Sequence, residues 1–288
     1  MRPRRCAHPE AGLSVAQFVH ARYAPRHENH ELALEPELKA LQRVVRIVRF
    51  LIMLRDPRPA QREFGTHRIG LVGDVHAEDA LLEVTLGFYW QNGIRTIVCT
   101  GDVMDGWGDA ERCCRLLRQY SVATVLGNHD EWYLNGQSRD LPEATPMGSL
   151  STQSQAFVAT LPRTLWYATA FGSVILCHGL GENNDASVEK SDEGDAITNN
   201  RELQDLIADP RVQIVMNGHT HEAVVRHFAG LTIVNAGSLH RDYEPVFLIV
   251  DFGTGAIDVL PVRDANIGTP LRLGELLPSR EMDQHRSL

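Results

Sequence analysis

Five short stretches of this chain place Asp, Asn or His directly after an apolar run rich in Val and Ile. Strands of an α/β domain that end in this way bring polar side chains to one edge of the sheet, where such folds bind ligands. Carboxylate, amide and imidazole groups gathered at one edge indicate a site for divalent metal ions. The stretches are Gly73-Asp74-Val75-His76, Gly101-Asp102-Val103-Met104-Asp105-Gly106, Gly127-Asn128-His129-Asp130, Cys177-His178-Gly179 and Asn217-Gly218-His219-Thr220-His221.

These stretches supply seven candidate metal ligands. They are Asp74, His76, Asp102, Asn128, His178, His219 and His221. Seven donors exceed the number that one four-coordinate ion takes. Two ions roughly 3.5–4 Å apart, bridged by one carboxylate, account for the number. Such a pair lowers the pKa of a bridging water enough to make hydroxide near neutral pH, and it holds a phosphate for in-line attack.

Each stretch alone also has a plain structural explanation. A single Asp-x-His is common in turns, Gly127-Asn128-His129-Asp130 alone fits a hairpin turn, and two histidines alone fit the end of a strand. The metal hypothesis therefore depends on the five stretches occurring together, each after an apolar run. The eight other histidines lack this setting and are interpreted as surface or packing residues, except His240, which stays a candidate.

The elements that must position these stretches alternate between strands and helices. Strands are expected at 68–73, 94–100 and 122–126, with helices at 80–92 and 110–120 between them. This order predicts parallel strands joined by right-handed crossovers. Further helices are expected at 154–161 and 201–208, and further strands at 173–177, 212–216, 232–235, 245–251 and 257–262, the last three antiparallel. The polar segment 181–200 is expected to be a lid, an insertion or a disordered segment.

Composition is that of an ordinary globular protein, with 288 residues of which 43% are hydrophobic and 23% charged. The formal net charge is −9, yet residues 1–65 carry 12 Lys/Arg against 7 Asp/Glu, a balance of +5. The remainder carries 16 of the 28 Lys/Arg and 30 of the 37 Asp/Glu, a balance of −14. An acidic catalytic body argues against a strong grip on nucleic acid, which needs a basic face.

The cysteines number five, an odd count, and none of them has a CxxC spacing. They are Cys6, Cys99, Cys113, Cys114 and Cys177. Adjacent cysteines cannot form a disulfide with each other without strain, so the pattern favours a reducing cytoplasm. The most apolar run, 44–54, contains two Arg residues and is too short to span a bilayer, so no transmembrane segment is predicted.

A basic, partly helical extension is expected at 1–66, before a catalytic domain at 67–265 and a tail at 266–288. Apolar residues at helical spacing predict a helix at 37–55. Its apolar side packs either on the catalytic domain or on a second copy of the chain, and a membrane-surface helix is the third alternative. The residues of this stripe are Leu38, Leu41, Val45, Val48 and Ile52.

The five motifs together resemble those of the calcineurin-like metallophosphoesterase superfamily, over about residues 67–262. The resemblance implies an α/β fold, a four-layer α/β/β/α sandwich of two mixed β-sheets. It also implies two divalent transition metal ions, manganese first, with iron, zinc and nickel as alternatives. The substrate that it implies is a small phosphorylated molecule.

The resemblance also implies a role for each site residue. Asp74, His76 and His221 would hold one ion, Asn128, His178 and His219 the other, and Asp102 would bridge the two. His129 would then be a proton donor to the leaving oxygen or a clamp on the phosphate. Asp105 would hydrogen-bond His129 and hold it in its working tautomer.

Departures from the superfamily's protein Ser/Thr phosphatases narrow the expected substrate. Those enzymes carry Arg after the second Asp and Glu after Asn-His, where this chain has Gly106 and Asp130. Without that Arg a phosphoprotein loses a bidentate partner for its phosphate. The turn Val234-Asn235-Ala236-Gly237-Ser238 resembles that of small bacterial phosphodiesterases, apart from Ala236, where those usually have Pro. His240 and Arg241 follow this turn and are either contacts for a substrate phosphate or bystanders.

We therefore predict a dimetal-dependent phosphoesterase that hydrolyses a phosphodiester, of nucleotide type or another small substrate, with metal-activated hydroxide as nucleophile and His129 as general acid. The alternatives are a phosphomonoesterase or a protein phosphatase of the same superfamily. A binding or scaffold protein without catalysis is the alternative from another class of function. Family members of that kind have typically lost metal ligands or the catalytic His. All seven ligands and His129 remain in this chain.

Overall fold

The computed structural model describes residues 61–137, 141–264 and 266–278. The chain divides into two units, Met1–Pro57 and Arg58–Leu288. The helix expected at 37–55, and any contact between copies through it, lies outside the described residues. The fold and the site described below belong to the second unit.

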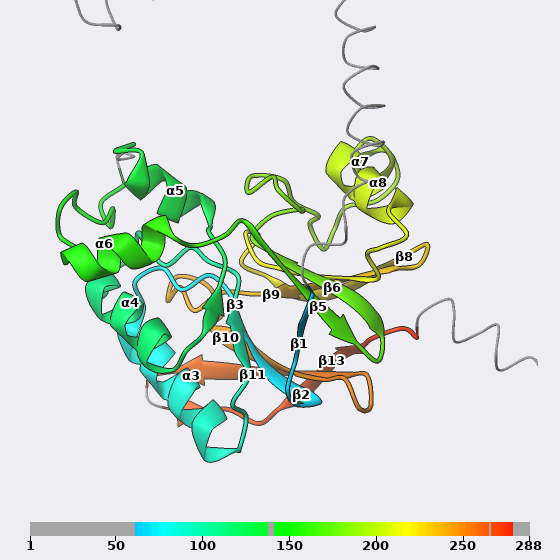
Figure 1. Ribbon diagram of the computed structural model, residues 1–288, viewed down its shortest axis with the longest axis horizontal. Coiled ribbons are helices and arrows are strands. Elements are labelled where there is room, and N and C mark those ends of the chain that lie inside the picture. The colour runs from blue at the N-terminus through cyan, green and yellow to red at the C-terminus, as the bar shows by residue number, and fades with distance from the viewer. Residues whose placement is uncertain (1–60, 138–140, 265, 279–288) are drawn as a thin grey trace, which may run out of the picture. The chain divides into compact units, whose positions relative to one another are not determined.

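Two mixed β-sheets form the framework of this unit, which confirms the predicted fold class (Figure 1). The six-stranded sheet contains β1 (Arg62–Glu63), β5 (Thr164–Thr169), β6 (Gly172–Cys177), β7 (Ile214–Asn217), β8 (Ala223–Phe228) and β9 (Leu231–Ala236), in the order β1-β5-β6-β7-β9-β8. The seven-stranded sheet contains β2 (Arg68–Val72), β3 (Ile97–Cys99), β4 (Ala123–Thr124), β10 (Val246–Asp251), β11 (Ala256–Arg263), β12 (Asn266–Ile267) and β13 (Leu271–Glu275). Its order is β12-β11-β10-β2-β3-β4, with β13 also paired to β11.

Helices pack on the outer faces of the two sheets (Figure 1). They are α3 (Asp79–Gln91), α4 (Ala110–Gln119), α5 (Asn128–Leu134), α6 (Thr152–Ala159), α7 (Asp195–Thr198) and α8 (Arg201–Ala208). One apolar cluster, containing Leu82, packs α3 and α4 on the seven-stranded sheet. A second, containing Leu71, lies between the sheets, and a third, containing Leu203, joins α8 to the six-stranded sheet.

Strand β2 lies inside the seven-stranded sheet and is buried on both faces, which explains its unbroken apolar sequence. Ile69 and Leu71 face the other sheet, while Val72 belongs to the cluster under the helices. Gly70 lies against the ring of Tyr89, where a Cβ atom would approach to 2.6 Å. The Tyr89 hydroxyl therefore reaches the sheet backbone and donates to the Leu71 carbonyl at 3.1 Å. This packing fixes α3 against the strand that leads into the first candidate metal-binding stretch.

The structure differs from the expected elements in the later strands. β9 pairs with β7 and β8, whereas β10 and β11 lie in the other sheet, so the three strands expected to be antiparallel neighbours are divided between sheets. Strands β1, β5 and β8 were not predicted. β8 is an edge strand whose apolar pattern is interrupted by Arg226 and His227. The seven-stranded sheet also continues into the segment expected to be a tail, where β12 and β13 pair with β11 although Leu271 is 61% exposed.

The polar segment 181–200 packs on the six-stranded sheet. Val188 is buried in the third apolar cluster. The guanidinium of Arg226 on β8 donates to the backbone carbonyls of Glu189 and Asp192, at 2.5 and 2.8 Å. Of the three alternatives, an insertion packed on the domain describes the segment best. Among the described residues, none of the helices has the length and apolar character required to cross a membrane.

Candidate metal centre

The five stretches that carry the candidate ligands lie together where the two sheets meet. β2, β3 and β4 are parallel neighbours and deliver the first three stretches, while β6 and β7 are parallel neighbours and deliver the last two. Asp74 forms a parallel bridge with Ser238, which joins the end of β2 to the segment after β9. Parallel strands end at the same edge of a sheet. Because polar residues directly follow each of these strands, their side chains lie close together at that edge. All nine site residues predicted from the sequence lie in this region.

Glycines at two of the stretches allow the loops to approach the candidate ligands. A Cβ atom on Gly127 would lie 2.1 Å from Asp102 Oδ1, and one on Gly218 would lie 2.0 Å from Asp74 Oδ1. Any side chain at either position would displace a carboxylate. These two motif positions therefore require glycine because a carboxylate lies against each, which the sequence alone does not reveal.

Backbone strain is concentrated at the candidate site. Eight non-glycine residues among those described have positive φ, and five of them are predicted site residues. They are His76 (45°), Asp102 (46°), Asp105 (58°), His219 (72°) and His221 (61°). A non-glycine residue held at positive φ costs on the order of 1–3 kcal/mol, and such residues tend to cluster at functional sites. The strain shows that the loops are held in one conformation by the surrounding structure.

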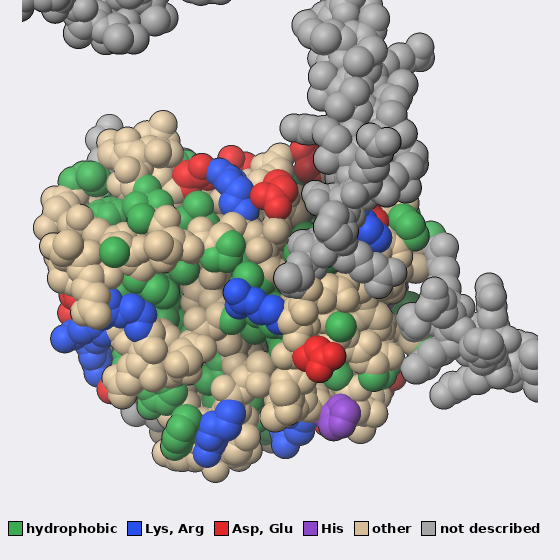
Figure 2. Space-filling view, viewed as in Figure 1, with side chains coloured by type: hydrophobic (Ala, Val, Ile, Leu, Met, Phe, Trp, Pro, Cys, Tyr) green, Lys and Arg blue, Asp and Glu red, His purple; other side chains and the backbone are tan. Residues whose placement is uncertain are grey.

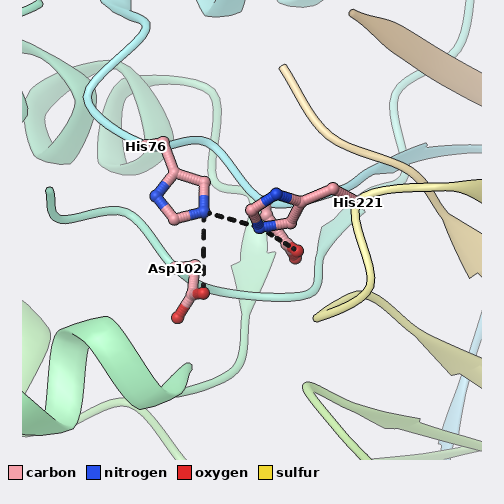
Figure 3. A group of neighbouring side chains, drawn as sticks. His76, Asp102 and His221 are labelled. Carbon is pink, nitrogen blue, oxygen red and sulfur yellow. Dashed lines mark hydrogen bonds and ion pairs between the residues drawn. The ribbon is translucent and has the colours of Figure 1, made fainter. Parts of the chain in front are cut away.

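One half of the centre consists of Asp74, His76 and His221, with Asp102 beside them. Figure 3 shows His76, His221 and Asp102. The ligand atoms of these four residues all lie within 4.8 Å of one another. The Nε2 atoms of His76 and His221 are 3.0 Å apart, and His221 Nε2 is 3.4 Å from Asp74 Oδ2. His76 Nδ1 donates to the backbone carbonyl of Asp105 at 2.8 Å, so in the neutral ring Nε2 presents a lone pair. Two imidazoles and two carboxylates in this arrangement fit a divalent transition metal ion.

The other half consists of Asn128, His178 and His219. Asn128 Oδ1 lies 2.7 Å from His178 Nε2 and 3.0 Å from His219 Nδ1. The two ring nitrogens are 3.3 Å apart. His178 Nδ1 donates to the carbonyl of Thr100 at 2.9 Å, which directs Nε2 into the centre. An amide oxygen and two imidazole nitrogens converge, and they fit a second ion in the same way.

Asp102 lies between the two halves. Its Oδ2 atom is 3.7 Å from His76 Nε2 in one half and 3.3 Å from His178 Nε2 in the other. Its Oδ1 atom accepts the backbone N–H of His129 at 2.9 Å. Burial opposes its ionisation, but the charge of His178 and a hydrogen bond from it lower the pKa of Asp102 well below its usual range. The carboxylate is therefore ionised and placed to contact both halves.

The histidines of the two halves differ in their proton affinity. Burial lowers the pKa of His76 to about 4, and burial together with the neighbouring His76 lowers that of His221 to about 3. Burial also lowers the pKa of His178, but Asp102 and Asp74 outweigh it and raise the value to about 10. Asp74 in turn has its pKa raised to about 7, first by burial and also by Asp102. The first half thus presents neutral imidazoles, and the second contains an imidazole that holds its proton beside carboxylates.

His129 lies beside both halves and is held by Asp105. Its Nδ1 atom is 2.8 Å from Asp105 Oδ2, and its ring centroid is 4.8 Å from that of His76. Asp105 is fixed by Thr145, whose backbone N–H donates to Asp105 Oδ1 and whose hydroxyl accepts the Asp105 N–H, both at 2.8 Å. Burial lowers the pKa of His129, but the hydrogen bond to Asp105 and the charges of Asp102, Asp105 and Asp130 together outweigh burial, and the pKa is raised. The ring is therefore oriented, and the shift favours its protonated form.

The sequence did not reveal the structural role of Asp130. This carboxylate is fully buried and accepts the backbone N–H groups of Gly127, Val103 and Met104, at 3.0, 2.8 and 3.1 Å. Burial, followed by the charge of Asp102, raises its pKa to about 6. It ties the start of α5 to the loop after β3. The fourth position of the Gly-Asn-His-Asp stretch thus helps to hold the site loops together, and the stretch opens a helix rather than a hairpin.

The two residues left open after β9 have different environments. Arg241 forms a bidentate pair with the buried Glu78, at 2.6 Å from Nε to Oε1 and 2.8 Å from Nη2 to Oε2, so its charge is already paired. His240 is only 7% exposed, and its ring centroid is 5.0 Å from that of His76. Its Nδ1 accepts the backbone N–H of Asp242 at 3.2 Å, which leaves the proton of the neutral ring on Nε2. His240 therefore belongs to the wall of the centre.

Comparison with known proteins agrees with this fold. The family model for the calcineurin-like phosphoesterase superfamily domain matches residues 68–255. A protein proposed to be a diadenosine tetraphosphatase superposes with a TM-score of 0.53 at 22% identity, covering 71% of this chain and 97% of that one. A hypothetical protein from Pyrococcus horikoshii OT3 superposes with a TM-score of 0.55 at 10% identity, covering 76% and 91% of the two chains. These structures share the fold.

A sequence relative matches a shorter part of the chain. An uncharacterised protein of Methanocaldococcus jannaschii is 31% identical over 72 residues, which is 25% of this chain and 30% of that protein. The matched segment thus spans less than a third of the relative. The described residues that could together hold a metal ion include Asp74, His76, Asp102 and His221. The chain belongs to the calcineurin-like phosphoesterase superfamily.

Proposed function

We propose that the protein is a dimetal-dependent phosphoesterase that prefers phosphodiesters of nucleotide type or of another small molecule. The observation that carries the proposal is the division of seven donors into two groups that share Asp102, whose Oδ2 lies 3.7 Å from His76 Nε2 and 3.3 Å from His178 Nε2. Asp74, His76 and His221 would hold one ion, and Asn128, His178 and His219 the other. Manganese is the first expectation, with iron, zinc and nickel as alternatives.

Two bound divalent ions supply two effects, a lower pKa for a coordinated water and neutralisation of charge on the phosphate. The chain itself supplies the proton for the leaving oxygen. His129 is oriented through Nδ1 by Asp105, and its raised pKa favours the protonated ring that a general acid requires. The opposite nitrogen, Nε2, carries the proton to be donated. Asp105 keeps this tautomer in place through its own bonds to Thr145.

The charges near the centre favour a diester over a monoester. Arg241, which follows His240 in the wall of the centre, is paired with Glu78. Cations already neutralised by carboxylates add little attraction for a second phosphate charge. A diester carries one negative charge and a monoester close to two. On the face shown in Figure 2 the described Lys and Arg side chains lie in separate groups, so that face has no continuous basic surface among them.

The compartment is proposed from the cysteines. Cys99, Cys113, Cys114 and Cys177 are all buried and unpaired. Burial raises the pKa of Cys99, Cys114 and Cys177, so these thiols stay protonated and unreactive. Buried free thiols support a reducing environment, and we propose the cytoplasm.

The experiment that tests the function compares diester and monoester hydrolysis. The purified full-length protein with added manganese is expected to cleave bis-p-nitrophenyl phosphate faster than p-nitrophenyl phosphate. His129→Ala is expected to slow the diester reaction by about 10²–10⁴-fold while the metal content, measured by elemental analysis, stays at two ions. His227→Ala, which removes an exposed histidine from the edge strand β8, is the matched control and keeps the rate.

Two outcomes separate the parts of the proposal. If wild type that contains two ions cleaves neither compound, the enzyme assignment is wrong. If it cleaves the monoester faster, the assignment to phosphoester hydrolysis stands and the diester preference is wrong.

A further inference from the structure

We propose that Trp107 and Tyr243 form a subsite beside the metal centre that binds the nucleobase of the substrate. This inference rests on the proposed function, because it names the group carried by the phosphoester that the centre would hold. It assigns a role to two side chains that neither the motifs nor the metal-ligand geometry uses.

The side chains of Trp107 and Tyr243 differ from most aromatic side chains of the described residues in being strongly exposed to solvent. Three aromatic side chains among the described residues are strongly exposed, Trp90 at 54%, Trp107 at 51% and Tyr243 at 51%. Large aromatic rings usually bury most of their surface, and exposed ones are typical of binding sites. Two of the three lie at the candidate centre. The third, Trp90, lies on α3, where Arg95 covers one face of its ring.

Direct contacts place Tyr243 against the first half of the centre. Its ring centroid is 4.5 Å from that of His221, edge to face at 86°. It is also 5.5 Å from the ring of His240, which itself lies 5.0 Å from His76. A substituent on a phosphate held near His76 and His221 therefore meets the Tyr243 ring within the length of a nucleoside.

Trp107 reaches the same place from another loop. The preceding residue, Gly106, is pressed on the His76 backbone so closely that a Cβ atom would lie 1.7 Å from the His76 carbonyl oxygen. The Trp107 indole Nε1 donates to Asp242 Oδ2 at 3.3 Å, next to Tyr243 in the chain. This bond joins the loop after β3 to the loop after β9 across the edge of the centre. Both aromatic side chains thus flank Asp242.

The loop that carries Tyr243 is held before any ligand binds. The Tyr243 backbone N–H donates to the His240 carbonyl at 3.0 Å, which closes a tight turn. Arg241 within this turn is clamped by the buried Glu78 through two side-chain bonds and one backbone bond. An aromatic ring on a fixed loop loses little conformational entropy on binding. The exposed ring is therefore a preformed surface for stacking.

Charge selects a nucleobase over further phosphate groups at this subsite. Asp242 has a side chain that is 63% exposed and accepts N–H donors, as the indole bond shows. A carboxylate here repels a polyphosphate chain but accepts hydrogen bonds from the exocyclic amino group of adenine, guanine or cytosine. Arg241, the cation nearest in sequence, is already paired with Glu78. Aromatic rings beside an acceptor match a planar base with an amino group.

The test compares adenosine 5′-monophosphate with ribose 5-phosphate, which carries the same phosphate and sugar without the base. Binding of each to the manganese-loaded full-length protein is measured by titration calorimetry. Wild type is expected to bind the nucleotide at least about tenfold more tightly, in line with base–aromatic stacking. Trp107→Ala and Tyr243→Ala are each expected to lower this ratio about fivefold or more.

Trp90→Ala is the matched control, because it removes an equally exposed indole from α3, and it should keep the wild-type ratio. Trp107→Phe, which retains a ring, should keep most of the preference and guards against a fold defect in the alanine variant. Equal binding of the two ligands to wild type overturns the subsite, and so does a Trp107→Ala or Tyr243→Ala ratio equal to that of wild type.

The calorimetric readout keeps this test apart from that of the proposed function. A protein that prefers the nucleotide but hydrolyses no phosphoester would retain the subsite and lose the enzymatic proposal. A protein that hydrolyses bis-p-nitrophenyl phosphate but binds both ligands equally would retain the enzymatic proposal and lose the subsite.

Discussion

The two halves of the centre use similar side chains in different surroundings. In the first half, His76 and His221 face each other 3.0 Å apart, and their pKa values are lowered to about 4 and about 3. In the second half, His178 is fully buried beside Asp102 and Asp74, and its pKa is raised to about 10. Burial lowers the pKa of all three histidines, and only at His178 do the charges of Asp102 and Asp74 outweigh it.

This contrast would make the two proposed ion sites unequal, although both use the same types of ligand. An ion must displace a proton from an imidazole that holds one, whereas a neutral imidazole binds directly. The first half is therefore expected to bind with little proton release at pH 8, above the pKa of about 7 of its carboxylate Asp74. The second half is expected to release a proton as its ion binds, so that its affinity rises with pH. Asp102 couples the halves, because its Oδ2 atom lies near a nitrogen of each.

Removing that coupling residue should give the largest effect. Asp102→Ala deletes the carboxylate that both halves share, so we expect the loss of both ions and of nearly all diester hydrolysis. The rate should fall by more than the ~10–100-fold that is typical for loss of an outer-shell partner. Elemental analysis and the hydrolysis rate check this together. Retention of one full ion by the variant would show that the halves are independent.

Removing one histidine from each half in turn should allow the ion binding of each half to be measured separately. His221→Ala is expected to lose about one ion from the first half, and His219→Ala about one ion from the second. Calorimetric titration with manganese in buffers of different ionisation enthalpy measures both the ion count and the protons released. At pH 8, above the pKa of Asp74 and below that of His178, the ion that remains in His221→Ala should bind with release of more protons than the one in His219→Ala. Identical titrations for the two variants would contradict the division into halves.

The sequence predicted which candidate ligands lie together better than it predicted the pairing of the strands. A strand end followed by Asp, Asn or His is a local pattern, and parallel neighbours gather such ends at one edge whatever the rest of the topology. The pairing of β9 with β7 and β8, and of β10 with β2, depends on contacts between distant segments that no local pattern encodes. Edge strands such as β8 and β13 are half-exposed and lack a clear alternation, so they were not predicted.

Within the site, the ligands were easier to predict than the residues that hold them. His76 and His221 stand in short motifs, whereas the buried Asp130 and the Glu78–Arg241 pair act through contacts with residues far away in the sequence. Trp107 and Tyr243 carry no sequence signal either, because only the fold shows that these rings are exposed beside the centre. Residues that act through tertiary contacts need the structure to be recognised.

The pKa difference between the halves also predicts a pH effect on stability. In the folded state the pKa of His221 is lowered from 6.5 to about 3. Its contribution to the stability of the folded state is therefore fully present above pH 6.5 and is lost as the pH falls. After the ions are removed with a chelator, the stability of wild type relative to His221→Ala should decrease by on the order of 2 kcal/mol between pH 6.5 and 5. Urea unfolding of both proteins measures this difference.

The comparison with the variant is necessary because buried carboxylates titrate in the opposite sense. The pKa of Asp74 is raised to about 7 and that of Asp130 to about 6, so their contributions favour low pH. His178, with a raised pKa, contributes stability that is complete below pH 6.5 and is lost as the pH rises toward 10. If the wild-type and His221→Ala curves run parallel from pH 6.5 to 5, His221 is not held neutral by the fold.

The smallest expected effect comes from Thr100, which serves the halves through different atoms. Its hydroxyl donates to Asp74 Oδ1 at 3.1 Å in the first half, and its backbone carbonyl accepts from His178 Nδ1 at 2.9 Å in the second. Thr100→Val removes only the hydroxyl and keeps the shape. We expect manganese affinity of the first half to fall about tenfold, with the second half unchanged and a stability loss of about 1 kcal/mol.

Thr100→Val combined with His219→Ala isolates the first half, and combined with His221→Ala it isolates the second, so that each affinity is measured alone. Thr85→Val is the matched control, because Thr85 is equally buried and its hydroxyl has no hydrogen-bond partner among the described residues. Equal weakening of both halves would mean that Thr100→Val shifts the backbone, and that the side chain of Thr100 does not act on Asp74 alone. Weakening confined to the first half would show that a single hydrogen bond tunes one ion site without the other.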